Sequence, residues 1–199
     1  MKVGFGITSS FCTFDKVLDE LIKLKEAGYD IYPIVSQNIV KYDTRFGTAK
    51  DFINAVEVIT EKKVVSDIVG AEEFGPKNPM DITVVVPATG DFIAKLAHGI
   101  TDNPVNMAVK ATIRNQKPIV IAVSTNDGLG LNGENIMRLL NEKGIYFVPF
   151  GQDNYIAKPN SLIAHYDLLI PTIEEALNGK QIQPVLQDYD KPKIKKLSK

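Results

Sequence analysis

Apolar and polar positions alternate along this chain in blocks that predict strands and helices in turn. Strand-like apolar runs cover residues 3–7, 31–35, 81–86, 119–123 and 145–148. Between these runs, apolar residues recur at the spacing of one helix face, first at Phe14, Val17, Leu18, Leu21 and Ile22. The runs at 81–86 and 119–123 lack polar alternation, which is typical of central strands in a parallel sheet. The pattern predicts a doubly wound α/β fold, with helices on both faces of a parallel sheet.

Capping residues predict where several helices begin. Thr48 precedes one amphipathic run, and Asn103 followed by Pro104 precedes another. Threonine and asparagine are good N-caps, and proline is favoured in the first helical turn. Thr172 and Glu175 have the spacing of a capping box, so the last helix is predicted to begin at Thr172 and to run up to the glycine at position 179.

Two stretches interrupt this regular pattern. Pro87 follows the apolar run 81–86 and is predicted to end that strand, because proline cannot donate to a ladder. Residues 63–80 contain short apolar pairs and a polar stretch, which predict either a short strand or a short helix.

Composition excludes several classes of protein. The 199 residues include 23 Lys+Arg, 24 Asp+Glu, one cysteine and two histidines. The balanced charge argues against nucleic-acid binding, and a single cysteine excludes intrachain disulfides and cysteine-rich zinc sites. No metal site is predicted. The N-terminus lacks a signal-peptide pattern and no apolar run reaches the roughly 18 residues of a membrane span, so we expect a soluble, cytoplasmic protein.

The charge is unevenly distributed between the body of the chain and its end. Residues 187–199 hold five lysines and two aspartates, which leaves 18 basic and 22 acidic residues elsewhere. We expect residues 1–186 to form one α/β domain, and 187–199 to be a lysine-rich tail of a composition that buries too little surface to order itself.

Small polar residues follow four predicted strands, at the edge where ligands bind in doubly wound sheets. The candidate cofactor-binding residues are Gly6, Thr8, Ser9, Ser10, Ser36, Pro87, Ala88, Thr89, Gly90, Asp91, Phe92 and Ser124. Hydroxyls and free N–H groups beside a helix start form a phosphate cradle without a cation. The alternative is that they only shape turns and cap helices, as Asp91 could. No nucleophile–base pair is evident, so cofactor binding is favoured over hydrolysis.

A longer motif at the third strand adds a family resemblance. Residues 87–103, PATGDFIAKLAHGITDN, resemble the signature of the FMN-binding flavoprotein family, which includes peptidyl-cysteine decarboxylases, phosphopantothenoylcysteine decarboxylase and flavin prenyltransferases. Residues 6–10 resemble the first FMN-phosphate loop of that family. The resemblance covers most of residues 1–178 and implies a Rossmann-like flavoprotein fold with FMN at the candidate residues.

Three further segments resemble one subgroup of this family, the B subunits of dipicolinate synthases. They are residues 73–81, 102–105 and 124–130. This resemblance implies oxidation of dihydrodipicolinate to dipicolinic acid during bacterial sporulation. It also implies a partner A subunit that carries NAD(P), a small dicarboxylate substrate, and a homo-oligomer, a trimer or larger.

The chain departs from the decarboxylases and prenyltransferases where they carry catalytic groups. Residues 75–81, GPKNPMD, lack the histidine of the decarboxylases, Cys12 is not on a substrate-clamping loop, and Ser124 stands where the prenyltransferases have arginine. Catalytic residues are therefore not assigned. Lys95 could place a positive charge near the site or a subunit interface. Lys95, Arg114 and Lys158 are candidates for the substrate carboxylates, and a non-catalytic accessory subunit or a decarboxylase-like enzyme remain alternatives.

Overall fold

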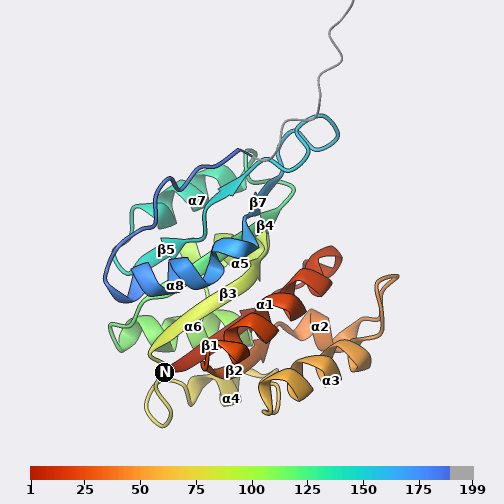
Figure 1. Ribbon diagram of the computed structural model, residues 1–199, viewed down its shortest axis with the longest axis vertical. Coiled ribbons are helices and arrows are strands. Elements are labelled where there is room, and N and C mark those ends of the chain that lie inside the picture. Colours follow the sequence, from red (N-terminus) through yellow and green to blue (C-terminus); the bar gives the residue numbers. More distant parts are fainter. Residues whose placement is uncertain (189–199) are drawn as a thin grey trace, which may run out of the picture.

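A parallel sheet in the order β2-β1-β3-β4-β5 forms the centre of the computed structural model, which describes residues 1–188 (Figure 1). Its strands are β1 (Lys2–Ile7), β2 (Asp30–Val35), β3 (Ile82–Ala88), β4 (Ile119–Thr125) and β5 (Ile145–Phe147). Two short strands, β6 (Phe150–Gly151) and β7 (Leu162–Ala164), extend the sheet antiparallel from the last residues of β4. The predicted doubly wound α/β fold is confirmed, and the antiparallel extension was not predicted.

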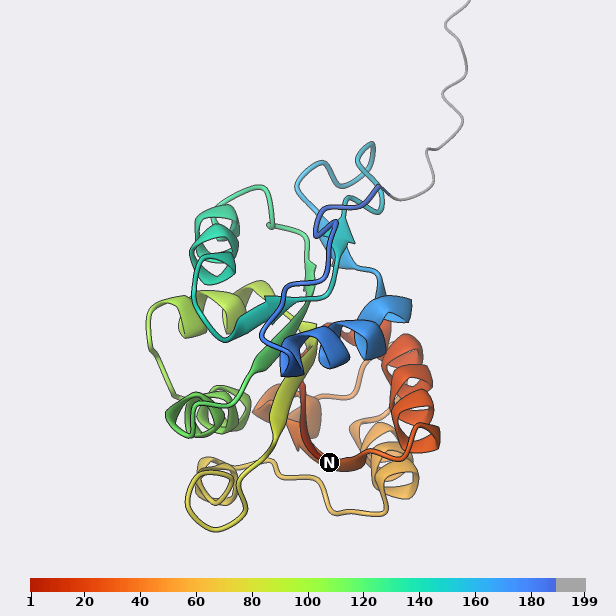
Figure 2. The ribbon, with the colours of Figure 1, turned by 60° about the vertical axis from the view of Figure 1, so that its left-hand side comes forward.

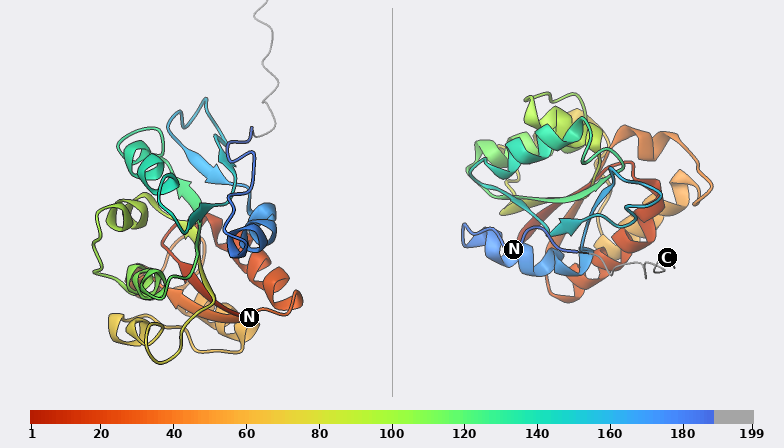
Figure 3. Two further views of the ribbon diagram at one scale, coloured as in Figure 1. Left: turned by 90° about the vertical axis from the view of Figure 1, so that its left-hand side faces the viewer. Right: turned by 90° about the horizontal axis from the view of Figure 1, so that it is seen from above.

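Helices cover both faces of this sheet (Figure 3). On one face lie α1 (Phe14–Glu26), preceded by the short 3-10 helix η1 (Phe11–Thr13), and α8 (Leu169–Leu177). On the other lie α5 (Gly90–Ala97), α6 (Pro104–Arg114) and α7 (Asn132–Leu140). Three further helices lie nearer the edge strand β2, namely α2 (Gln37–Lys41), α3 (Ala49–Thr60), which packs against α1, and α4 (Ile68–Glu72), which packs against α6.

The two apolar runs without polar alternation form the middle of the core. Every residue of β3 is buried, and so is every residue of β4 except Thr125. Strands covered on both faces gain burial on both sides, at about 25 cal/mol per Å² of apolar surface. The sequence pattern therefore located the centre of the sheet correctly.

The outer strands are shielded by the last described residues. Residues 180–188 run back along this edge of the sheet (Figure 2), and Val185 and Gln187 bond to the Phe150 backbone of β6. The Gln181 side chain bonds to both backbone groups of Phe147 in β5. Covering an edge in this way prevents pairing with other chains.

Pro87 does not end β3, contrary to the prediction. The strand continues to Ala88, with a shift in its register against β4 between Val85 and Ala88. The irregularity accommodates a residue that has no N–H to donate. The Pro87 carbonyl still accepts from Thr8, from the backbone N–H at 3.3 Å and the hydroxyl at 2.7 Å.

The predicted capping box of the last helix is also wrong. The helix α8 begins at Leu169, directly after the 3-10 helix η2 (Tyr166–Leu168). Thr172 is fully buried inside α8, and its hydroxyl donates to the Leu168 carbonyl at 2.6 Å. A threonine can bond back to the preceding turn in this way, so the pattern alone did not identify a helix start.

The other helix starts agree with the predictions. The Thr48 hydroxyl accepts from the Asp51 N–H at 3.1 Å, and Asn103 Oδ1 accepts from the Asn106 N–H at 3.0 Å. Residues 63–80 contain the short helix α4, capped by Asp67. The short helix α2 was not predicted.

Neither a membrane span nor a metal site is found in the described part of the chain. No helix within residues 1–188 is long and apolar enough to cross a bilayer. The same residues contain no group of three or more His, Cys, Asp or Glu side chains placed to hold a metal ion. Of the predicted tail, residues 189–199 lie outside the described residues.

Candidate functional site

The carboxyl ends of β1 and β3 meet at the point where the strand order reverses, which is where ligands bind in this topology. Thr8 joins the two strand ends. Its hydroxyl donates to the Pro87 carbonyl at 2.7 Å and accepts from the Thr89 N–H at 3.0 Å. The Ser36 N–H, after β2, donates to the Ile7 carbonyl at 2.9 Å. Three strand ends are therefore fixed to one another by neutral hydrogen bonds.

An open cavity lies at this junction, between the starts of α2, α5 and α6. Its lining residues are Thr8, Ser9, Ser36, Gln37, Asn38, Thr89, Asp91, Phe92, Lys95, Asp102 and Asn103. Six of them are among the predicted cofactor-binding residues. The Ser9 and Ser36 hydroxyls come from different loops and lie 3.5 Å apart, so both can contact one small group.

A second cluster of hydroxyls lies on the β4 side of the same edge. Ser10 Oγ and Ser124 Oγ are 2.9 Å apart, and Ser124 is buried. Thr13 donates to the Ser10 carbonyl, from its hydroxyl at 2.7 Å and its N–H at 3.1 Å. Tyr166 is buried beside Thr13 and Ser124, and burial raises its pKa to about 12 although these two hydroxyls lower it in part. The phenol therefore keeps its proton at neutral pH.

Several other predicted residues are buried, and of these only Phe92 also lines the cavity. Gly6, Pro87, Ala88, Gly90 and Phe92 are buried. A Cβ on Gly6 would lie 2.7 Å from Val105 Cγ1, and one on Gly90 would lie 2.6 Å from Asn132 Nδ2. Real Cβ atoms do not approach so closely, so these glycines allow close packing of β1 on α6 and of α5 on α7.

The one lysine that lines the cavity is held by two carboxylates. Lys95 Nζ lies 3.2 Å from Asp91 Oδ2 and 3.1 Å from Asp102 Oδ2. Partial burial lowers the pKa of Lys95, but hydrogen bonds with Asp102 and Asp91 outweigh it and hold the pKa above its usual range. The lysine stays charged, yet the group as a whole carries net negative charge. An anion bound here must therefore rely on O–H and N–H donors.

Asp91 does not cap α5, contrary to one interpretation of the sequence. The cap is Thr89, whose hydroxyl accepts from the Phe92 N–H at 3.5 Å. Asp91 follows in the first turn, where a carboxylate is favoured by the helix dipole. Its side chain is directed to Lys95.

The other two candidate cations are not brought to the cavity. Arg114 is in the last turn of α6, and α6 starts at the carboxyl edge, so Arg114 lies at the opposite end of the sheet. Lys158 is exposed in the loop between β6 and β7. Conversely, Gln37 and Asn38 line the cavity and were missed because the short helix α2 was not predicted. Tyr166 was missed because nothing in the sequence places it beside Ser124.

The arrangement is suited to binding an anionic, flat ligand. Hydroxyls from three loops and the N-terminus of α5 offer donors to a phosphate. The FMN phosphate fits this donor set, which comprises Thr89 at the helix start and Ser9 and Ser36 from two other loops. Among the cavity-lining residues there is no histidine or cysteine, and the titratable side chains Asp91, Lys95 and Asp102 are paired with one another.

Three comparisons with known proteins identify the family of the chain. The family model described as Flavoprotein matches residues 1–166. The dipicolinate synthase B subunit of Bacillus subtilis (strain 168) is 47% identical over 185 residues, which cover 93% of this chain and 92% of that protein. The crystal structure of the dipicolinate synthase B subunit from Bacillus halodurans C shares 51% identity and a TM-score of 0.87, covering 94% of this chain and 96% of that one.

A more distant structure shares the fold alone. It is the dodecameric FMN-dependent UbiX-like decarboxylase from Escherichia coli O157:H7, with 19% identity and a TM-score of 0.61. The match covers 75% of this chain and 80% of that one.

Proposed function

The chain belongs to the flavoprotein family, and on this premise we propose that it serves as the B subunit of a dipicolinate synthase and binds FMN at the carboxyl edge. The resemblance of nearly the whole chain to two such proteins supports the assignment. The observation that carries the FMN part is the hydroxyl-lined cavity at the β1/β3 junction, where this topology binds ligands.

The residues of the cavity divide the task of holding FMN. Ser9 and Ser36 donate hydroxyl hydrogens to the phosphate, and the N-terminus of α5 after Thr89 adds backbone donors. Thr8 is already bonded on both sides and fixes the spacing of the two strand ends. Lys95 is paired with Asp91 and Asp102, so the phosphate is left to the hydroxyl and N–H donors. FMN, when bound, supplies an acceptor for the hydride that leaves the dihydropyridine ring.

The wider context of this protein is also part of the proposal. We infer a partner A subunit with an NAD(P) site, a small dicarboxylate substrate, and a homo-oligomer of three or more copies. The setting is the cytoplasm of a sporulating bacterium. The dodecameric assembly of the E. coli flavoprotein fits the inferred oligomer.

A second candidate function is that of a non-catalytic subunit. It is favoured by the absence of histidine and cysteine among the residues that line the cavity. The same observation speaks against the decarboxylase-like alternative. Cys12 is exposed in η1 and is not one of the lining residues.

Reconstitution separates these candidates. The purified chain is titrated with FMN and followed by flavin fluorescence, then assayed with dihydrodipicolinate alone, with the A subunit, and with the A subunit and FMN. The proposal predicts FMN binding and dipicolinate formation that depends on added FMN. Full activity of the complex without bound flavin would support the non-catalytic role instead, and failure to bind FMN would exclude the flavin role.

A further inference from the structure

A buried phenol without a hydrogen bond lies directly behind the carboxyl edge. Tyr166 is 6% exposed, and its hydroxyl is one of three buried side-chain atoms without a partner among residues 1–188. Burying a hydroxyl without a hydrogen bond is unfavourable. Its nearest polar neighbours, Thr13 and Ser124, belong to the hydroxyl cluster described above.

Ser10 is the member of this cluster that can reach a ligand. Its backbone is already used, because its N–H donates to the Thr8 carbonyl at 2.8 Å and its carbonyl accepts both Thr13 donors. Its half-buried side chain meets Ser124 Oγ at 2.9 Å and Cys12 Sγ at 3.9 Å. The hydroxyl hydrogen of Ser10 is therefore the one donor of this residue that remains to be assigned.

Only two directions of hydrogen bonding are possible through the Ser10–Ser124 pair. In one direction, Tyr166 donates to Ser124, Ser124 donates to Ser10, and Ser10 directs its hydrogen outward. In the other, Ser10 donates to Ser124, Ser124 donates to Tyr166, and Tyr166 donates to Thr13. The first direction makes the site a donor toward a ligand, and the second makes it an acceptor.

We propose that Tyr166 is a positioning residue that donates to Ser124 and so turns the Ser10 hydroxyl into a donor for a carboxylate of the substrate. This inference rests on the proposed function, since the carboxylate is that of the dihydrodipicolinate ring. Ser10 follows Ser9, which lines the FMN cavity, and its half-buried side chain lies at the same carboxyl edge of the sheet. A carboxylate needs donors, and the nearby Lys95 is already paired with two aspartates.

We call the chain of hydrogen bonds from Tyr166 through Ser124 to Ser10 the relay. Tyr166→Phe tests its direction, because the substitution removes the hydroxyl and retains the ring. Dipicolinate binding to the FMN-loaded protein is measured by calorimetry for the unmodified chain, Tyr166→Phe, Ser124→Ala and the double variant. Loss of one neutral hydrogen bond corresponds to an affinity about three- to tenfold weaker. Tyr146→Phe, in β5, is the matched control, and thermal unfolding checks that each variant is folded.

The relay predicts that Tyr166→Phe weakens dipicolinate binding, that Tyr146→Phe does not, and that the double variant binds no more weakly than Ser124→Ala. Such non-additivity is expected of residues that act through one another. FMN affinity should stay unchanged in Tyr166→Phe and in Tyr146→Phe. Tighter dipicolinate binding by Tyr166→Phe would establish the opposite direction and overturn the inference. Absence of dipicolinate binding to unmodified, FMN-loaded protein would also overturn it and leave the flavin proposal standing.

Discussion

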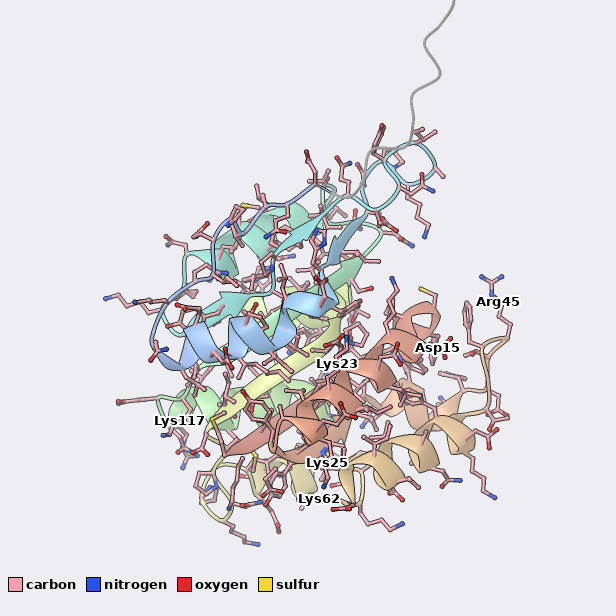
Figure 4. All side chains as sticks on the ribbon, in the orientation of Figure 1. Asp15, Lys23, Lys25, Arg45, Lys62 and Lys117 are labelled. Atoms are coloured by element: carbon pink, nitrogen blue, oxygen red, sulfur yellow. The ribbon has the colours of Figure 1, made fainter. Side chains whose placement is uncertain are left out.

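The two ends of the central sheet are fixed by different chemistry. At the amino ends of the strands, the Asp81 carboxylate accepts from the Lys2 N–H at 2.9 Å, and Lys62 pairs with Asp30. At the carboxyl ends, the strands are joined to one another by a neutral hydroxyl, that of Thr8 between the ends of β1 and β3. The ion pairs of Lys95 lie in the lining of the cavity beside them. Figure 4 shows Lys62 in the lower part of the molecule, apart from Arg45, which lies at the right-hand side on the loop between α2 and α3.

Because of this difference, we expect the amino edge of the sheet to contribute to stability and the carboxyl edge to bind the ligand. Ion pairs at an exposed edge contribute only about 0–1 kcal/mol and leave no donor for a ligand. Hydroxyls can fix a strand end, as Thr8 does, or keep a hydrogen for an anion, as Ser9 and Ser36 can. Changes at the carboxyl edge should therefore affect flavin affinity first, and changes at the amino edge should affect stability alone.

The largest effect is expected from removing both cradle hydroxyls. In Ser9→Ala/Ser36→Ala, each lost bond to the phosphate contributes about 1.5 kcal/mol, so FMN should bind roughly a hundredfold more weakly. Fluorescence titration measures the affinity, and urea unfolding should be unchanged. Ser66→Ala, before α4, is the control. An affinity within a factor of two of the unmodified protein would mean that the phosphate lies elsewhere.

Thr8→Val tests a residue that lies at the carboxyl edge but contributes to stability, because its hydroxyl joins the ends of β1 and β3. The substitution leaves the Thr89 N–H without its acceptor and weakens the contact to Pro87. We expect a loss of about 2 kcal/mol in the free energy of unfolding, measured by urea denaturation. Thr8→Ser keeps the hydroxyl and should recover most of the loss. Equal stability of the two variants would contradict the role of this hydroxyl.

The next smaller effect on stability is expected from Glu20, whose buried carboxylate lies away from both edges of the sheet. Glu20 in α1 is buried, with Oε2 unpartnered, and burial raises its pKa although Lys23 opposes the shift. A raised folded-state pKa means that ionisation destabilises the fold above the unfolded pKa near 4.5. Glu20→Gln should be more stable by about 1 kcal/mol at neutral pH.

The pH dependence of the stability gained by Glu20→Gln serves as the control for this prediction. The advantage of Glu20→Gln should shrink as the pH falls and disappear below about pH 4.5, where Glu20 is protonated in both states. Thermal unfolding across this range measures it. An advantage that does not change with pH would show that side-chain shape, and not charge, is responsible.

The smallest effect is expected at the amino edge. The Lys62 ammonium, which also lies 4.5 Å from the Tyr32 ring centroid, lowers the pKa of Asp30 through their hydrogen bond. Lys62→Met should reduce stability by less than about 1 kcal/mol at neutral pH, a loss that fades as acid protonates Asp30. FMN affinity should not change. A clear loss of FMN affinity would contradict the separation of the two edges.

The sequence predicted the parallel half of the fold well and the antiparallel half poorly. Buried strands such as β3 and β4 are recognisable from their uniform apolar pattern, and their carboxyl ends indicated the cavity. The strands β6 and β7 have two and three residues, too short for a periodic signal. Tyr166 reaches Ser124 only because β7 pairs with the end of β4. That contact depends on long-range pairing, which local sequence does not encode.

The proposed binding of the FMN phosphate by neutral hydroxyls at the carboxyl edge is open to direct measurement. It is tested most directly by the affinities of the unmodified protein for FMN and for riboflavin, which lacks the phosphate, between about 0.05 and about 0.5 M salt. FMN should bind at least about a hundredfold more tightly than riboflavin, with little loss as salt increases. Equal affinities, or an FMN affinity that falls steeply with salt, would contradict it.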